Sequence, residues 1–339
     1  MSAVAGKSGS DRAYVAPRLS PMTPTSADGS EQFRLLGVPI SDAIVQECVD
    51  YLIKLQKSAV DAFTTIPAPD TYAGIRKQEQ DTIGQLPAGP RQDARRALVM
   101  LSFDAANLSW ETGMEHLDAL RHNMLKKPPP VWSCLTLARA AVEAFAFSHY
   151  HLDPTIGLPQ RLARTSGTWV MEYRNQASSA ARAENLTQAG YDARVQAATQ
   201  QGELDPVLPA GARRHTDKGK KGYLVDGAFA PRDPKISSLI SSFLPKWLPR
   251  DGTYSLLSGA AHARPWLLKQ AQPHGHSGWE GEAAMLVTAV IVVAGGMSAA
   301  LSAWCGYCGG DAEAIGPEID VTAWAFIMRC AGIAHGTSS

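Results

Sequence analysis

Hydrophobic residues recur at helical spacing along most of the chain, and runs that alternate apolar with polar residues are nearly absent. Recurrence at every third and fourth position predicts amphipathic helices, whereas alternation predicts strands. We therefore expect little sheet and an all-α helical bundle. Ser41 is a suitable N-cap for the first helix. The predicted helices cover residues 38–57, 92–125, 131–151, 159–183, 187–201, 236–244, 253–262, 281–303 and 321–332.

The segments between these helices suggest how the chain is organised. Residues 1–33 are rich in Ser, Pro, Thr, Gly and Ala, which cannot offset the entropy of ordering, so they predict a disordered tail. Residues 34–100 are expected to form an N-terminal region of helix and loop. Residues 101–335 are expected to form the bundle domain. Within it, about residues 203–233 are rich in Gly, Pro, Lys and Arg and predict a polar loop insertion.

Composition restricts the class of protein only loosely. The 339 residues are 45% hydrophobic, and Lys plus Arg equals Asp plus Glu at 32 each. A neutral chain can attract nucleic acid only through a local basic patch. Five cysteines in a chain of this length do not indicate a disulfide framework. No signal peptide is recognisable, so a cytoplasmic location is expected.

Residues 283–303 contain no charged residue and are long enough to cross a bilayer. The nearest flanking charges, Glu282 and Asp311, are acidic, so no basic anchor lies at either end. The segment is also rich in Ala, Gly and Ser, which allow close helix packing. We expect a buried helix of a soluble core and no membrane insertion.

Two helices place polar residues among apolar ones. Arg139 and Glu143 are four residues apart on one helix, while Tyr254, Ser258 and His262 follow each other at intervals of four on another. In one interpretation these five residues form a catalytic site, with His262 as acid or base, Glu143 orienting it and Arg139 clamping an anion. In the other, Arg139 and Glu143 form an ion pair at a groove edge, and His262 caps its helix.

Three further motifs carry possible chemistry. Trp304 precedes Cys305-Gly306-Tyr307-Cys308, which resembles the Trp-Cys-Gly-x-Cys site of thioredoxin-like proteins. Here the motif follows a helix, whereas that chemistry needs a helix to begin after it. His116 lies between carboxylates, but no Glu-x-x-His occurs, so neither a metal nor another cofactor is expected. The basic run 213–221 is either solvated surface or a phosphate-binding segment.

Several pieces of the chain together resemble an uncharacterised family of helical proteins common in actinobacteria. That family is similar in outline to HEPN-like helical bundles, several of which are ribonucleases in toxin or defence systems. The arginine-then-histidine spacing of those ribonucleases occurs here as Arg329 and His335. The pieces that carry the resemblance are His116-Leu117, Arg139-Ala140-x-x-Glu143, Leu152-Asp153-Pro154, Arg161 with Arg164, and Tyr254-x-x-x-Ser258-x-x-x-His262.

Two classes of function follow. The resemblance implies an RNA-directed or toxin- or defence-associated protein, with RNA, an antitoxin or a second copy of the chain as partner. The alternative is a small-molecule-binding or catalytic bundle with an Arg/Glu/His pocket. His116, Arg161, Arg164 and Arg264 are the expected substrate-binding residues. Convergence of the five polar residues on a closed pocket favours the small-molecule class, whereas an open groove continuous with residues 213–221 favours the RNA-directed class.

Overall fold

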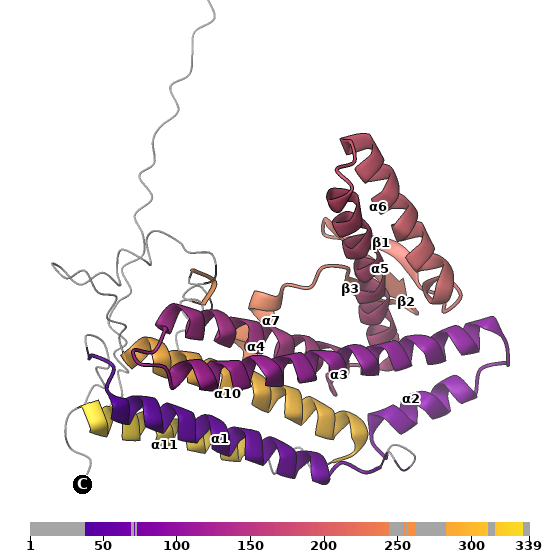
Figure 1. Cartoon of the computed structure of the whole chain (residues 1–339). Helices are drawn as coiled ribbons and strands as arrows, with labels where there is room; N and C mark the ends of the chain where they lie inside the picture. Colours follow the sequence, from indigo (N-terminus) through magenta and orange to yellow (C-terminus); the bar gives the residue numbers. More distant parts are fainter. Residues whose placement is uncertain are drawn as a thin grey trace, which may run out of the picture.

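A 35-residue helix, α3 (Pro90–Met124), runs along the molecule (Figure 1). It contacts a larger part, which is a bundle of long helices, and a smaller part, which is built of two helices and a sheet. The structure is a computed structural model that describes residues 38–68, 71, 73–243, 254, 257–259, 261, 283–310 and 316–334. The described chain is mostly helical, which confirms the all-α bundle. The expected tail, residues 1–33, lies outside the described residues.

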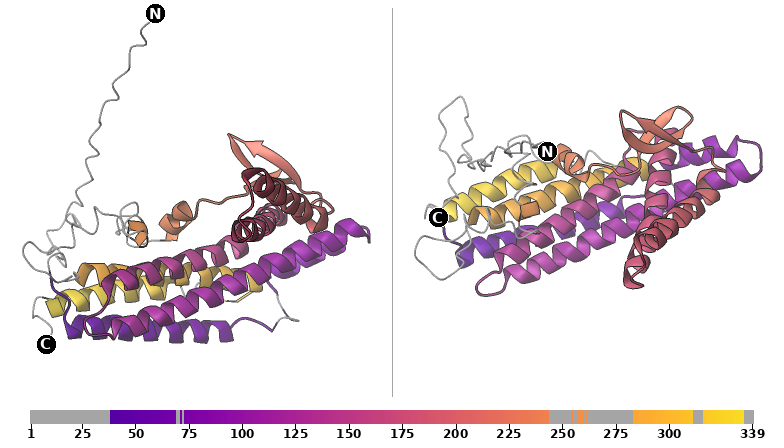
Figure 2. Two further views of the ribbon diagram at one scale, coloured as in Figure 1. Left: turned by 45° about the horizontal axis from the view of Figure 1, so that its top comes forward. Right: turned by 90° about the horizontal axis from the view of Figure 1, so that it is seen from above.

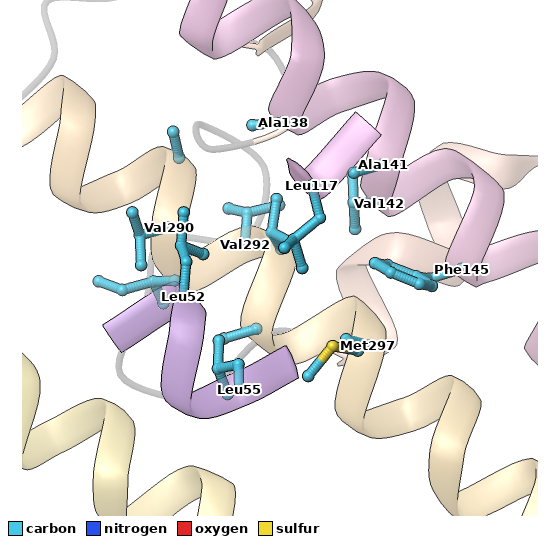
Figure 3. Packing of buried hydrophobic residues seen from close by; sticks show 14 of the residues in the cluster. Leu52, Leu55, Leu117, Ala138, Ala141, Val142, Phe145, Val290, Val292 and Met297 are labelled. Atoms are coloured by element: carbon cyan, nitrogen blue, oxygen red, sulfur yellow. The ribbon is translucent and has the colours of Figure 1, made fainter. Parts of the chain in front are cut away.

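The larger part is a bundle of long helices. Helix α4 (Val131–Leu152) packs along α3 and α10 (Ala283–Cys308), while α1 (Asp42–Thr64) and α11 (Gly316–Ala334) cover α10. Short helices α2 (Ile75–Gly84) and α7 (Ile236–Phe243) pack against this group. Apolar side chains of α1, α3, α4 and α10 meet in one continuous core, including Leu52, Leu117, Val142, Phe145 and Val290 (Figure 3).

The smaller part stands away from the long axis of the bundle (Figure 2). Helices α5 (Leu158–Ala183) and α6 (Gln188–Gly202) form an antiparallel pair, followed by a short π-helical turn, η1 (Glu203–Val207). Three antiparallel strands come next: β1 (Arg213–Asp217), β2 (Lys220–Val225) and β3 (Ala228–Pro231). The sheet packs on α5, and a second hydrophobic core joins the sheet and α5 to the N-terminal half of α3.

The sheet corrects our prediction of a polar loop at residues 203–233. Each hairpin closes through two residues with positive φ, Lys218-Gly219 (46° and 78°) and Asp226-Gly227 (45° and 88°). Two consecutive residues of positive φ are typical of the type I′ turn, whose twist suits paired strands. The Asp226 carboxylate also accepts hydrogen bonds from Arg95 at 2.7 Å and Arg91 at 3.2 Å, which hold the second turn on α3. Turn chemistry, more than strand hydrophobicity, specifies this sheet.

Helices α4 and α10 are both long and apolar enough to cross a membrane on length and composition. Most of α10 is nevertheless covered by protein, with α1, α4 and α11 around it. At Gly296 an added β-carbon would lie 2.7 Å from a Val142 methyl carbon, so α10 and α4 approach too closely there for a larger residue. This contact is typical of a core helix.

We therefore expect the protein, expressed and lysed without detergent, to stay in the supernatant after ultracentrifugation. A helix whose apolar surface is already covered by other helices gains little from insertion into lipid. Fractionation of the lysate followed by immunoblotting measures the distribution. Recovery only from the detergent-solubilised membrane pellet would contradict the core-helix interpretation.

Candidate anion-binding site

A pocket of about 700 Å³ lies between α6 and the sheet, beside α5, and we call it the α6 pocket. Cations dominate its charged lining. Asp192 supplies the only carboxylate among the described residues that line it. Neutral polar side chains complete the wall, Gln196, Thr199 and Gln200 from α6 and Thr216 from β1. The cationic residues are Arg174 of α5, Arg214 of β1, Lys221 of β2, and Arg232, which follows β3, and His215 of β1 lies beside them.

One arginine of the α6 pocket is neutralised by the fold. Arg214 donates two hydrogen bonds to the buried Glu203 carboxylate, and the Tyr223 hydroxyl donates to the same group. The bond to Glu203 raises the pKa of Arg214, so this guanidinium stays charged and bound to its carboxylate. Arg214 thus fixes β1 to the end of α6 and is poorly placed to serve as a free anion ligand.

Two other arginines are compensated only weakly, since the charge of Asp233 opposes but does not cancel the lowering of the Arg232 pKa. Within the described part of the chain, Arg174 and Arg232 make no ion pair, and the Arg232 Nε is buried without a hydrogen-bond partner. Gly167 of α5 lets the backbone of Arg232 lie close to this helix, since a β-carbon there would lie 3.1 Å from the Arg232 Cα. Burial and, after it, the charge of Arg174 lower the pKa of Arg232. The pocket therefore concentrates positive charge that an anion would stabilise.

A second pocket of about 630 Å³ adjoins the first and shares Lys221 and Arg232 with it. We call it the Tyr150 pocket, and we call the two pockets together the basic groove. The lining of the Tyr150 pocket adds Arg164, Lys220 and Lys235, and Asp233 is the one carboxylate among its described lining residues. The two pockets thus form a continuous cationic surface around the strands that the basic run 213–221 builds.

Tyr150 lines the second pocket, and its hydroxyl is buried without a hydrogen-bond partner in the described structure. Burial raises its pKa to about 12, so the phenol keeps its proton at neutral pH and can donate it in a hydrogen bond. Arg164 lies 4.4 Å from the Tyr150 ring centroid and donates to the Tyr150 carbonyl at 2.7 Å. It also pairs with Asp153 at 3.2 Å. The expected substrate-binding residue Arg164 therefore does line a pocket, with part of its charge already compensated.

The predicted meeting of α4 with the Tyr254 segment is confirmed. Glu143 accepts hydrogen bonds from the Arg139 Nε and the Tyr254 hydroxyl, both at 2.7 Å, through one oxygen. Arg139 lies 5.7 Å from the Tyr254 ring centroid. Glu143 therefore neutralises the arginine that we expected to clamp an anion, and the cluster links two segments 111 residues apart in sequence. Ser258 is half-buried, whereas His262 and Arg264 lie outside the described residues. The catalytic role stays a prediction.

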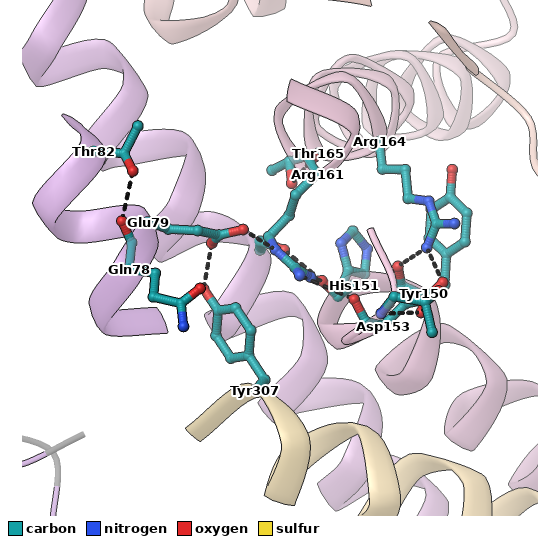
Figure 4. Close-up of polar contacts among 12 residues, drawn as sticks. Gln78, Glu79, Thr82, Tyr150, His151, Asp153, Arg161, Arg164, Thr165 and Tyr307 are labelled. Atoms are coloured by element: carbon teal, nitrogen blue, oxygen red, sulfur yellow. Dashed lines mark hydrogen bonds and ion pairs between the residues drawn. The ribbon is translucent and has the colours of Figure 1, made fainter. Parts of the chain in front are cut away.

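Arg161, the other expected substrate-binding arginine, lies inside the protein (Figure 4). Its side chain has 0% exposure and pairs with Glu79 at 2.9 Å. Its other nitrogens donate to the carbonyls of His151 and Asp153, and its guanidinium lies 4.5 Å from the Tyr307 ring centroid. All three guanidinium nitrogens of Arg161 therefore donate hydrogen bonds to groups inside the protein. The structure thus places Arg161 in an internal network that joins α2, α4, α5 and α10, away from any substrate surface.

The remaining candidates are scattered. His116 is half-buried on α3, and Arg329 of α11 binds Glu47 of α1 while His335 lies outside the described residues. Cys305 and Cys308 lie in the last turn of α10 with both thiols buried, at the helix C-terminus that the sequence predicts. Across the described ranges, no group of three or more His, Cys, Asp or Glu side chains is arranged to hold a metal ion.

Sequence reasoning missed Arg174, Arg232 and Tyr150 as site residues. Only the basic run 213–221 pointed to this region, and a signal for its structure was present. Asp226-Gly227 between short β-prone runs is a strong indication of a hairpin. A hairpin there would have brought residues 213–232 together as a folded surface.

Comparisons with known proteins were made at the level of family models, curated sequences and solved structures, and none of the three found a match.

Proposed function

We propose that this protein binds RNA through the phosphate groups that occupy the basic groove. The observation that supports the proposal is the pair Arg174 and Arg232, two guanidiniums that face one pocket without a carboxylate partner among the described residues. Holding like charges together in a partly buried site is unfavourable unless an anion compensates them. The proposal retains the RNA-directed function that the HEPN-like resemblance implies.

Guanidinium chemistry favours phosphate as that anion. Arginine presents a planar set of donors that matches two oxygens of a phosphate, and the resulting bonds are short and strong. Lys221 adds a third cation on the boundary between the two pockets. Carboxylates are few along this surface, with Asp192 in one pocket and Asp233 in the other. The local field is therefore positive, although the net charge of the chain is zero.

The shape of the site favours a chain of phosphates over a single one. Lys221 and Arg232 belong to both pockets, so the two pockets are adjacent and have these cations in common. Neutral donors and acceptors, Gln196, Gln200 and Thr216, line the α6 pocket beside its cations. Such groups can bond the sugar hydroxyl and base edges that RNA displays and that inorganic polyanions lack.

We expect Arg174→Gln with Arg232→Gln to weaken RNA binding at least about tenfold at moderate salt, because two charge-assisted contacts are lost. The slope of log affinity against log salt should fall by about 2, one for each lost phosphate contact. Fluorescence anisotropy with a labelled oligonucleotide, repeated over a series of salt concentrations, measures both quantities.

The matched control is Lys54→Gln with Lys57→Gln, which removes the same charge from an exposed face of α1. This control should retain wild-type affinity to within about twofold, since exposed charges beyond a Debye length are screened. Thermal melting of both double variants verifies that they fold. Equal loss of binding in the two double variants, or no RNA binding by the wild type, would refute the proposed function.

A further inference from the structure

The sheet has a second face, which the basic groove reaches only at its edge, through His215 and Lys220. Side chains of a strand alternate between faces, and Tyr223, Val225 and Ala230 are buried on the face toward α5. The alternate positions in the paired strands therefore point away from α5. They are Arg213, His215, Asp217, Lys220, Gly222, Leu224, Phe229 and Pro231, and all of them except Gly222 are exposed or half-buried.

An aromatic pair lies on this outer face. The rings of His215 on β1 and Phe229 on β3 are 5.6 Å apart between centroids and inclined at 75°. They belong to the two outer strands and meet over β2, where His215 pairs with Gly222 and Phe229 pairs with Leu224. A β-carbon at Gly222 would lie 2.8 Å from the Phe229 ring and 2.0 Å from the Ala230 carbonyl oxygen. Glycine thus lets the phenyl ring lie over the middle strand and reach the imidazole.

Cations flank this aromatic pair. Arg213 shares its face, and Lys220 and Lys221 are consecutive on β2 and so point to opposite faces of the sheet. Both lysines line the Tyr150 pocket, so they stand where the basic groove meets the edge of the sheet. A polyanionic strand that leaves the groove past Lys221 would pass Lys220 and arrive at the outer face.

We infer that this face stacks an unpaired nucleobase on the Phe229 ring, beside the inclined His215 ring, so that the ligand of the basic groove is single-stranded RNA. The inference rests on the proposed function. Aromatic rings beside a cationic track are the usual means of holding single strands, because every base offers a flat face to a ring. Paired bases in a duplex are stacked on each other and cannot lie on the sheet.

Three probes test the inference: an oligouridine of about 12 nucleotides, a duplex of the same length, and inorganic polyphosphate as a baseless polyanion. Wild type should bind the single strand about 5- to 150-fold more tightly than either other probe, the range expected for one stacked base. Phe229→Leu should lose most of this preference and keep its affinity for polyphosphate. Phe229→Trp should restore the preference, since indole also stacks.

Affinity for polyphosphate serves as the internal check that the Phe229 variants retain the basic groove. A wild type that binds all three probes equally, or a Phe229→Leu variant with the wild-type preference for single strands, would overturn the stacking site. Either result would leave phosphate binding in the groove intact. Failure of the wild type to bind any of the probes would instead overturn the proposed function, and the stacking site with it.

Discussion

Replacing Glu79 with glutamine should lower the free energy of unfolding by about 3–5 kcal/mol, the effect expected when one partner of a buried ion pair loses its charge. The pair with Arg161 has side-chain exposures of 4% and 0%. Without the carboxylate, the guanidinium would remain buried with only carbonyl oxygens and the Tyr307 ring as partners. Water cannot solvate it there, so the charge becomes a direct cost of folding.

The position of Glu79 makes the effect larger than a single contact suggests. Its second oxygen accepts the Tyr307 hydroxyl at 3.0 Å, so one carboxylate joins α2 to both α5 and α10. Burial, followed by the charge of Glu79, raises the pKa of Tyr307, which therefore remains a donor. Substitution would weaken the attachment of three helices together.

A second ion pair on α2 gives a matched control. Lys77 and Asp81 lie 3.6 Å apart with side-chain exposures of 60% and 61%. Asp81→Asn should cost less than about 1 kcal/mol, because water screens the pair and solvates the lysine left behind. Urea unfolding followed by circular dichroism measures both variants. Similar, small losses in the two would show that the Glu79–Arg161 pair contributes no more than a surface bridge.

The helices could be predicted because each one buries a long apolar stripe. Ser41 accepts the Ile44 amide at 3.3 Å, as its position before the first stripe predicts. The strands could not be found in the same way. All five residues of β1 are exposed, so no alternation of apolar and polar residues marks it. Its pairing depends on Lys218-Gly219 and Asp226-Gly227, and turn residues were the only local signal.

Among the candidate site residues, contacts within one helix could be predicted from spacing, whereas contacts set by long-range packing could not. Spacing within one helix predicted the Arg139–Glu143 pair, and polar residues within an apolar segment pointed to Tyr254 as a neighbour. Sequence could not distinguish Arg161 from Arg164, which are one turn apart on α5. Arg161 is enclosed because Glu79, 82 residues earlier, folds against it. Long-range packing decides that Arg164 lines a pocket while Arg161 is enclosed, and no local pattern records it.

The same reasoning applies to the basic groove. Arg174 and Arg232 are brought together only because the sheet packs on α5 at Gly167. Neither belongs to the basic run 213–221, which drew attention to the region. The run supplies Lys220 and Lys221 to the groove, whereas its Arg214 is bound by Glu203. Density of charge in the sequence therefore located the surface, and the fold determined which charges are available to a ligand.

Stability should also decline steeply on mild acidification because of His151. This histidine is 1% exposed, and its Nδ1 has no hydrogen-bond partner in the described structure. Burial, with the charges of Arg164 and Arg161 behind it, lowers its pKa from 6.5 to about 3. Its carbonyl accepts from Arg161 and from Ser102, which fixes the residue at the end of α4.

The sign follows from comparing the folded and unfolded states. Above pH 6.5 His151 is neutral in both, so it adds no dependence on pH. Below that value His151 is protonated in the unfolded chain, whereas in the folded protein it stays neutral until the pH approaches 3. The free energy of unfolding should therefore fall as the pH falls through this window, by up to about 1.4 kcal/mol per pH unit for one proton.

Urea unfolding of the wild type and of His151→Gln between pH 7 and about pH 5 tests this, because most carboxylates stay ionised in that range. Any effect of glutamine that is the same at every pH shifts the whole stability curve, so the informative quantity is the difference in slope between the two proteins. We expect the wild type to lose about 1 kcal/mol more than the variant between pH 6 and pH 5. His149, whose pKa burial also lowers, is present in both proteins and cancels from the difference. If the free energy of unfolding changed with pH in parallel for the two proteins, His151 would take up its proton equally in the folded and unfolded states. That result would contradict its burial beside Arg161 and Arg164.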